Sequence, residues 1–327
     1  MRKLPPWLAP LVLLAWSLGS GGAWAQTYGV GISASTPNLG LVASATSGDT
    51  VFTIASSTGA VTKASGNGAR ISTGTTRATV TVTCGNQNQC NSTDVDVKIG
   101  VVGTPTNRAR ALTNFNVAMG TATLSGSVTG TSPITFRIGP IGKNSSKSFF
   151  VGANFPVAGD DSGKPTGAGN SGFYVFVAKA NTTPTTGSSA GVATVTAYKQ
   201  LSLSKTSNLS FGRVVRPLSG SGTVSVSATT GTRTITAGVA LSTPSPTRAS
   251  YTATGEANKQ ISVTVPSAFN MTGPATIVVT LTNDTLGLIS LSSGGTFTFN
   301  VGGSFPISST TVNGAYSGSF LVQVDYN

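Results

Sequence analysis

Four short stretches of the chain match strings found in catalytic motifs. Residues 167–172 fit the G-x-G-x-x-G pattern of a dinucleotide site, and residues 159–164 resemble a P-loop with one residue too few between its glycines. Residues 187–191 fit the G-x-S-x-G string of a nucleophile elbow, and residues 202–205 fit S-x-x-K. These motifs work where a helix begins at the phosphate or the nucleophile, but the surrounding residues alternate like strands or form turns. We expect no catalytic or cofactor site at any of them.

The composition lacks the usual catalytic base. The chain contains no histidine, the commonest general base and a frequent metal ligand. Asp160 and Asp161 are adjacent in a loop and could contribute to a calcium site, but no third oxygen donor follows at a fixed spacing. A polar turn tip is the simpler interpretation. We therefore predict a protein that is not an enzyme and that has no metal site and no cofactor.

The charges are few and scattered. Only 9% of the 327 residues are charged, and 20 Lys plus Arg against 8 Asp plus Glu give a net charge of +12. A nucleic-acid binder normally gathers its basic residues in a cluster, and Arg108 with Arg110 is the nearest approach to one here. We expect no nucleic-acid partner. With 38% hydrophobic residues, the chain is also too apolar for intrinsic disorder.

The first 25 residues have the pattern of a signal peptide. Arg2 and Lys3 precede an apolar run at residues 8–18, and Ala23 and Ala25 form a small-x-small cleavage site. The run is about half the length of ~20 residues that a membrane-spanning helix needs. We predict cleavage after residue 25 and a mature chain without an integral membrane segment. It would be exported to the periplasm, the cell surface or the medium.

Cys84 and Cys90 are the only two cysteines of the chain. An alternating run at residues 78–83 precedes them, and Gly, Asn and Gln between them favour a turn. A cysteine pair in an exported protein normally oxidises, whereas a structural zinc site needs four ligands. We predict a disulfide that joins the end of a strand to its own loop.

The chain repeats itself. Residues 149–157 recur as residues 299–307 with five of nine positions identical, and a block beginning Ser171-Gly172 is matched by one beginning at Ser317. Matching blocks occur in the same order in both halves, which indicates one unit used twice. We place the first domain at residues 26–181, a linker at 182–191 because it has turn formers and no apolar pattern, and the second domain at 192–327.

Both halves have the alternation of strands. Apolar and polar residues alternate over short runs rich in Val, Ile, Thr, Phe and Tyr, and Gly, Ser, Asn or Pro bound these runs. No dozen residues of the mature chain follow the helical period. The fold class that this predicts is all-β, with two tandem immunoglobulin-like antiparallel β-sandwich domains after the signal peptide.

The second half closely resembles a bacterial family known only as domain of unknown function family 4402. The resemblance is carried by Phe211-Gly212, by Thr254-Gly255-Glu256 and most specifically by the ending at residues 316–327. The first half resembles a diverged copy, since it has Leu41 near the place of Phe211 and ends in Ala180-Asn181. Its assignment depends on the internal repeat.

A looser resemblance is to chaperone-usher pilins, whose subunits end in an alternating strand with a penultimate aromatic residue. Tyr326 is penultimate here and Gly314 is fourteenth from the end. The resemblance implies that an alternating N-terminal segment completes the sheet of a neighbouring subunit. The plain alternative is that both ends are ordinary strands of closed sandwiches. The residues concerned in these two segments are Tyr28, Val30 and Ile32 at the start and Phe320, Val322, Val324 and Tyr326 at the end.

Two functions follow from these features. The first is an exported structural or adhesive protein of the bacterial cell surface, a fimbria-like subunit, whose partners are further copies, other surface subunits and a periplasmic chaperone. The alternative is a periplasmic or extracellular module that binds a glycan or another ligand. Trp7, Trp16 and Trp24 all lie in the signal segment, so the mature chain has no tryptophan to stack on a sugar, and this weakens the alternative.

Overall fold

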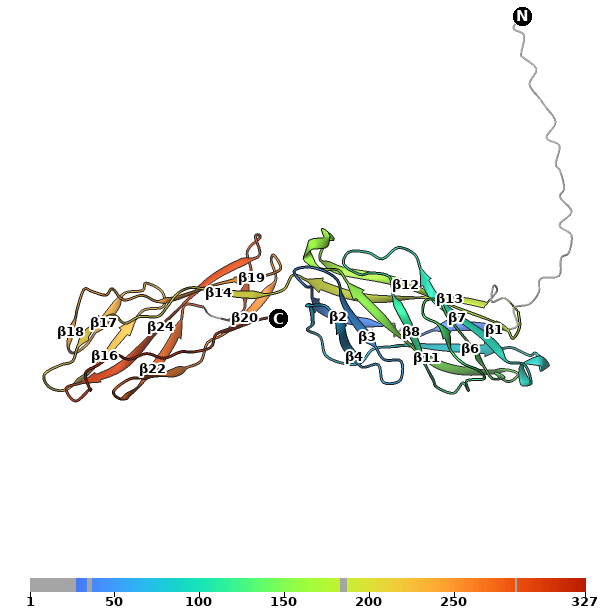
Figure 1. Cartoon of the computed structure of the whole chain (residues 1–327), viewed down its shortest axis with the longest axis horizontal. Coiled ribbons are helices and arrows are strands. Elements are labelled where there is room, and N and C mark those ends of the chain that lie inside the picture. Colours follow the sequence, from blue (N-terminus) through green and yellow to red (C-terminus); the bar gives the residue numbers. More distant parts are fainter. Residues whose placement is uncertain (1–27, 34–36, 183–186, 286) are drawn as a thin grey trace, which may run out of the picture.

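The computed structural model describes residues 28–33, 37–182, 187–285 and 287–327. Strands dominate these ranges, and two bodies follow one another along the long axis of the molecule (Figure 1). The expected signal peptide at 1–25 lies outside the described residues. Among the described residues, no helix has the length and hydrophobicity that crossing a membrane requires. The all-β prediction is confirmed, and the immunoglobulin-like type of the sandwiches stays a prediction.

One sheet of the first domain is centred on a long strand, β11 (Ser145–Val157). Alternate residues of its neighbour β6 (Ala78–Cys84) are buried, because successive strand side chains point to opposite faces. The other strands of this sheet are β1 (Tyr28–Ile32), which pairs with β6, then β3 (Thr50–Ile54) with β4 (Val61–Ser65), and β8 (Thr113–Met119), which also pairs with β11.

The second sheet of this domain faces the first across an apolar core. Phe149 of β11 meets Phe136 edge to face, with ring centroids 5.3 Å apart, and both rings are buried. The strands follow in the order β5 (Ala69–Arg70), β2 (Asn38–Ala43), β13 (Gly187–Tyr198), β12 (Gly167–Lys179), β7 (Val95–Val102), β10 (Ile134–Ile138) and β9 (Thr129–Gly130).

Strand β13 corrects the expected domain boundary. The sequence placed a linker at residues 182–191 and the second domain from 192, but Gly187–Tyr198 is one strand that pairs antiparallel with β12 and parallel with β2. Its inward residues Ala193, Val195 and Ala197 are buried in the first core. The prediction was wrong because it took Gly, Ser and Thr as turn formers. These residues also occur in strands where small inward side chains pack against a bulky neighbour.

The second domain repeats the order of the first sheet. Its central strand β24 (Thr296–Ser308) carries Phe305, which pairs with Val224 as Phe155 of β11 pairs with Phe52. The repeat in sequence is thus a repeat in topology. The strands around β24 are β14 (Ser202–Ser207) with β19 (Ala249–Thr254), β16 (Ser221–Val226) with β17 (Arg233–Ile235), and β22 (Thr276–Asn283) with β21 (Ala268–Thr272).

The facing layer of the second domain is split into two pieces. A ribbon of β15 (Val214–Val215) and β18 (Val239–Ala240) lies apart from a three-stranded sheet, and no described strand joins the two. The three strands of that sheet are β23 (Ile289–Ser290), β20 (Gln260–Thr264) and β25 (Gln323–Tyr326).

The predicted disulfide is present. Cys84 ends β6, Cys90 lies in the short 3-10 turn η1 (Asn88–Asn91), and the two sulfurs are bonded with Cα atoms 6.4 Å apart. Both cysteines are buried in the first core. The bond therefore joins a strand end to its own loop, as expected.

The block match between the two domain endings is shifted by one residue. The sequence aligned Tyr174 with Phe320, but in β12 the buried residues are Phe173, Val175 and Val177, and Tyr174 faces outward. In the second domain it is Phe320 that packs against the core. Because side chains alternate with period two, a shift of one residue exchanges the two faces, and burial is the evidence that detects it.

Candidate functional site

The first domain shows what a closed sandwich of this topology contains. In it, β13 lies between β12 and β2: its residues 187–197 pair with β12, and its residues 194–198 pair with β2. Val195 at the middle of β13 is 2% exposed, and its neighbours on the same face are also buried. One strand therefore seals the core along this side of the domain.

The second domain has a groove at the same place. The counterpart of β2 is the segment around β15, since β15 pairs with β18 as β2 pairs with β5. β25 pairs with β20 as β12 pairs with β7, so the counterpart of β12 is β25 together with the segment that leads into it. Between these walls, residues 208–216 on one side and residues 311–320 on the other, lies an open space of about 1040 Å³.

The floor of this groove is aromatic and apolar. The Phe211 and Phe305 rings meet edge to face at 4.9 Å between centroids, and Phe269 packs on Phe320 at 5.1 Å. Phe305 is 8% exposed, whereas Phe155, at the same position of the repeat, is 0% exposed. Val215 and Val312 on the rims are about half exposed. Tyr251, Met271 and Ile277 also line the floor.

The N-terminal segment lies in its own domain. Tyr28, Val30 and Ile32 belong to β1, whose register with β6 runs from Tyr28↔Cys84 to Ile32↔Val80. Tyr28 is 3% exposed, its hydroxyl has no hydrogen-bond partner among the described residues, and burial raises the pKa of this hydroxyl. The structure thus places these three side chains against the first core of the same chain.

The C-terminal segment forms one wall of the groove and then reaches the first domain. Phe320 and Val322 are half-buried against the second core. They precede β25, which starts at Gln323. Val324 pairs with Val263. Tyr326 lies beyond the groove, at the joint between the domains.

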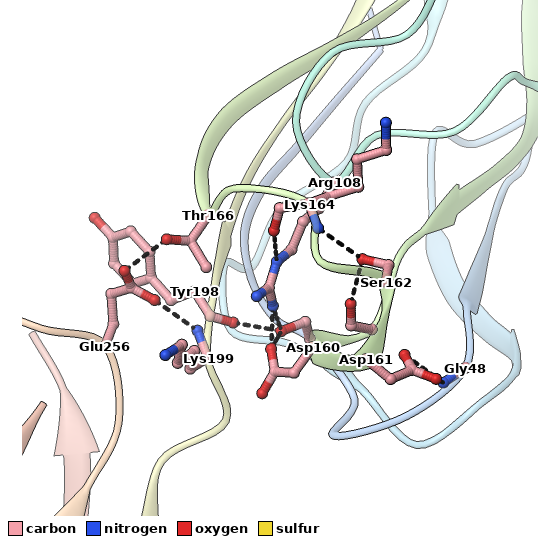
Figure 2. Close-up of polar contacts among 12 residues, drawn as sticks. Gly48, Arg108, Asp160, Asp161, Ser162, Lys164, Thr166, Tyr198, Lys199 and Glu256 are labelled. Atoms are coloured by element: carbon pink, nitrogen blue, oxygen red, sulfur yellow. Dashed lines mark hydrogen bonds and ion pairs between the residues drawn. The ribbon is translucent and has the colours of Figure 1, made fainter.

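Polar contacts define this joint. The Glu256 carboxylate accepts a hydrogen bond from the Thr166 hydroxyl at 2.6 Å and another from the Lys199 N–H at 3.0 Å, as Figure 2 shows. The Tyr326 hydroxyl donates to the Lys199 carbonyl at 2.8 Å and accepts from the Glu256 N–H at 2.6 Å. Its ring lies edge-on to Tyr198, with centroids 5.6 Å apart. Burial raises the pKa of Tyr326, and the hydrogen bond from Glu256 partly opposes this.

The second half of the chain has a family match. Residues 201–326 match the model of the family Domain of unknown function (DUF4402). The predicted resemblance of the second half is therefore confirmed. The DUF4402 match runs from β14 to β25 and includes both walls of the groove.

A solved structure of the pilus class is also similar in part. It is the chaperone–tip adhesion subunit pre-assembly complex CsuC-CsuE from the archaic chaperone-usher Csu pili of Acinetobacter baumannii. The alignment has a TM-score of 0.26 and 9% sequence identity, and it covers 91% of this chain and 99% of that chain. A search of curated proteins finds no match.

The acidic loop that resembled a calcium site has a different role. Asp160 pairs with the buried guanidinium of Arg108 and accepts a hydrogen bond from the Ser44 hydroxyl at 2.9 Å. The Asp161 carboxylate accepts from the Gly48 N–H at 3.0 Å (Figure 2). Within the described ranges, no three potential metal ligands gather. These acids instead anchor the loop that precedes β12.

Sequence reasoning missed the joint and the groove. Glu256 belongs to the motif shared with DUF4402, and nothing in its spacing indicates contact with Thr166, 90 residues away. The strings at 167–172 and 187–191 lie in the paired strands β12 and β13. No local pattern signals the groove, because the remaining strands of the second domain carry the same alternation as those of the first.

Proposed function

We propose that the chain is an exported, non-enzymatic subunit of a bacterial surface fibre, and that its second domain receives a β-strand from another polypeptide. The observation that carries this proposal is the groove at the position of β13. Edge strands with unpaired N–H and C=O groups accept added strands, and an apolar floor stabilises such an addition by burial.

The connection between the two domains supports the proposal. β13 ends at Tyr198 and β14, the first strand of the second domain, begins at Ser202. The strand that closes the first domain is therefore also the N-terminal extension of the second domain. If the next polypeptide supplied an equivalent extension to the groove, its domain would follow in line, as the second domain follows the first in Figure 1.

The other features are consistent with a surface location. A disulfide fits an oxidising compartment, and the predicted signal peptide fits export. An open apolar groove, with Val215 and Val312 exposed on its rims, also requires protection before assembly, which is what a periplasmic chaperone would provide. The first domain, whose core is closed, is then free to serve as a structural or adhesive module.

A strand peptide tests the proposal directly. A synthetic peptide of residues 187–198 has the sequence that fills this position in the first domain, and in the full chain the corresponding site of that domain is already occupied. We expect the peptide to bind and to stabilise the second domain, by about 1.4 kcal/mol at ten times its Kd. Differential scanning calorimetry and isothermal titration calorimetry would measure both effects.

The control is the same peptide with Val195→Asp, which would place a carboxylate on the apolar floor. It should neither bind nor shift the unfolding of the second domain. If both peptides bind equally, or neither binds, the groove does not accept a strand and the proposal is wrong.

A further inference from the structure

We infer that the strand received by the groove carries carboxylates next to its apolar residues, so that the partner segment is acidic as well as alternating. This inference rests on the proposed function and specifies the partner. It starts from a difference in charge between the two domains. Neither β2 nor β13 carries a charged residue, whereas Arg213 and Arg216 lie on the corresponding wall of the groove.

The strand registers show where these arginines would lie. Val42 pairs with Arg70 in the first domain, and Val214 pairs with Ala240 in the second. Val214 thus takes the place of Val42, and both contact their core. By this register Arg213 takes the place of Leu41.

In the first domain, Leu41 stands opposite Thr196 of β13. The Ser44 N–H donates to the Tyr198 carbonyl at 2.8 Å, and Arg216 takes the place of Ser44 in the same register. Tyr198 itself stands opposite Ala43, whose place Val215 takes. A received strand would therefore bring its residue equivalent to Thr196 directly beside Arg213, and its end, equivalent to Tyr198, within one residue of Arg216.

Among the described residues, no carboxylate lines the groove to offset its positive charge. Lys205, Arg213 and Arg216 line the groove, all three are exposed, and no acidic residue belongs to the lining. None of the three takes part in a salt bridge with the described residues. The Arg216 guanidinium donates to the Thr311 carbonyl at 2.8 Å and so holds the rims together. Opposite charges on neighbouring strands stabilise pairing, and like charges oppose it.

The same charge pattern argues against a second copy of this chain as the occupant. The segment Tyr28–Ile32 contains no acidic residue, and it is already paired with β6. The inference therefore favours a different polypeptide, whose strand alternates apolar and acidic residues near its C-terminal end.

Three matched peptides test the inference. Each has residues 187–198 with Thr196 and Tyr198 both replaced: Thr196→Glu with Tyr198→Glu, the same two positions changed to Gln, or both changed to Lys. Binding to the full chain would be measured by isothermal titration calorimetry at low salt and at about 1 M salt, where the screening length is about 3 Å. We expect the acidic peptide to bind about 5- to 10-fold more tightly than the Gln peptide, and the Lys peptide more weakly.

High salt should remove most of this preference. The variant Arg213→Gln with Arg216→Gln should also lose it, whereas Lys179→Gln, an exposed charge on β12 of the first domain, should retain it. A fourth peptide, residues 26–34, represents a second copy.

Each outcome decides. If the three peptides bind equally, the groove accepts a strand but its charge does not select the partner, and this inference is wrong while the proposed function stands. Tighter binding of the Lys peptide, or of residues 26–34, would overturn the inference in the same way. If no peptide binds, the proposed function fails as well.

Discussion

The two domains share one topology and differ in one strand. In the first, β13 fills the space between β12 and β2, and the core residues there are fully buried. In the second, the corresponding space is an open groove, and most apolar residues around it are only partly buried. The difference teaches that the alternating pattern specifies the sheets of such a domain, while closure depends on a strand that follows the domain in the chain or comes from elsewhere.

The joint between the domains adds to this comparison. The strand that closes the first domain continues directly into the second, and Glu256 and Tyr326 of the second domain bond to the three-residue connection that leaves β13. The strand that closes the first domain is thus also held, just after its C-terminal end, by hydrogen bonds to the second domain. A strand received by the second domain would enter near this joint, because β25 ends there.

The largest effect is expected where the sealing strand is broken. Val195→Asp places a charge at a position that is 2% exposed, and an unpaired buried carboxylate costs about 4 kcal/mol or more. We expect the first domain to lose most of its stability, while the unfolding transition of the second domain stays unchanged. Differential scanning calorimetry would resolve the two transitions. Destabilisation of both domains would show that the stability of the second core also depends on β13.

Phe155 and Phe305 occupy the same position of the repeat, so truncating each one compares the closed first core with the open second core. Phe155→Ala should destabilise the first domain by about 3 to 5 kcal/mol, because it leaves a closed cavity. Phe305→Ala should cost less, about 1 to 3 kcal/mol, because water already reaches the groove.

The matched control compares two separate variants, Phe149→Ala in the first domain and Phe299→Ala in the second. Both rings are 0% exposed, so these two losses should be similar. Equal losses at Phe155 and Phe305 in chemical denaturation would contradict an open second core.

The disulfide is a feature of the first domain alone, since the chain has no cysteine beyond Cys90. Cys84→Ser with Cys90→Ser should lower the free energy of unfolding of that domain by about 1 to 2 kcal/mol, because the closed loop is short. The second transition should not move. Thiol labelling of the unreduced native protein should modify neither cysteine, and modification of both would show that the bond does not form.

The smallest effect is expected at the joint. Glu256→Gln with Thr166→Val in a double-mutant cycle should give a coupling energy of about 0.5 to 1.5 kcal/mol, the usual net contribution of one intramolecular hydrogen bond, because solvent at this partly exposed joint screens the carboxylate. The readout is the separation of the two unfolding transitions, which should widen when the contact is lost. A coupling energy of zero would mean that the domains meet without the Glu256 contact.

Much of the fold could be predicted from residue patterns. The alternation, the repeat and the cysteine pair each depend on residues close together in sequence, and the all-β class, the shared topology and the Cys84–Cys90 bond all agree with the structure. Two details failed for a common reason. The boundary at 182–191 and the alignment of Tyr174 with Phe320 both required knowledge of which strand lies beside which, and local composition does not contain it.

The sequence by itself determined which side chains face a core, because a strand must place alternate residues on opposite faces, and a repeated pattern must build a repeated sheet. Only the tertiary structure decided which domain each strand completes. β13 joins β12 and β2 through pairings such as Thr196 with Leu41, and these partners lie far apart in the chain. A domain that has its last strand and a domain that lacks it show the same alternation of apolar and polar residues in their other strands. The groove therefore becomes visible only when the strands are placed in space.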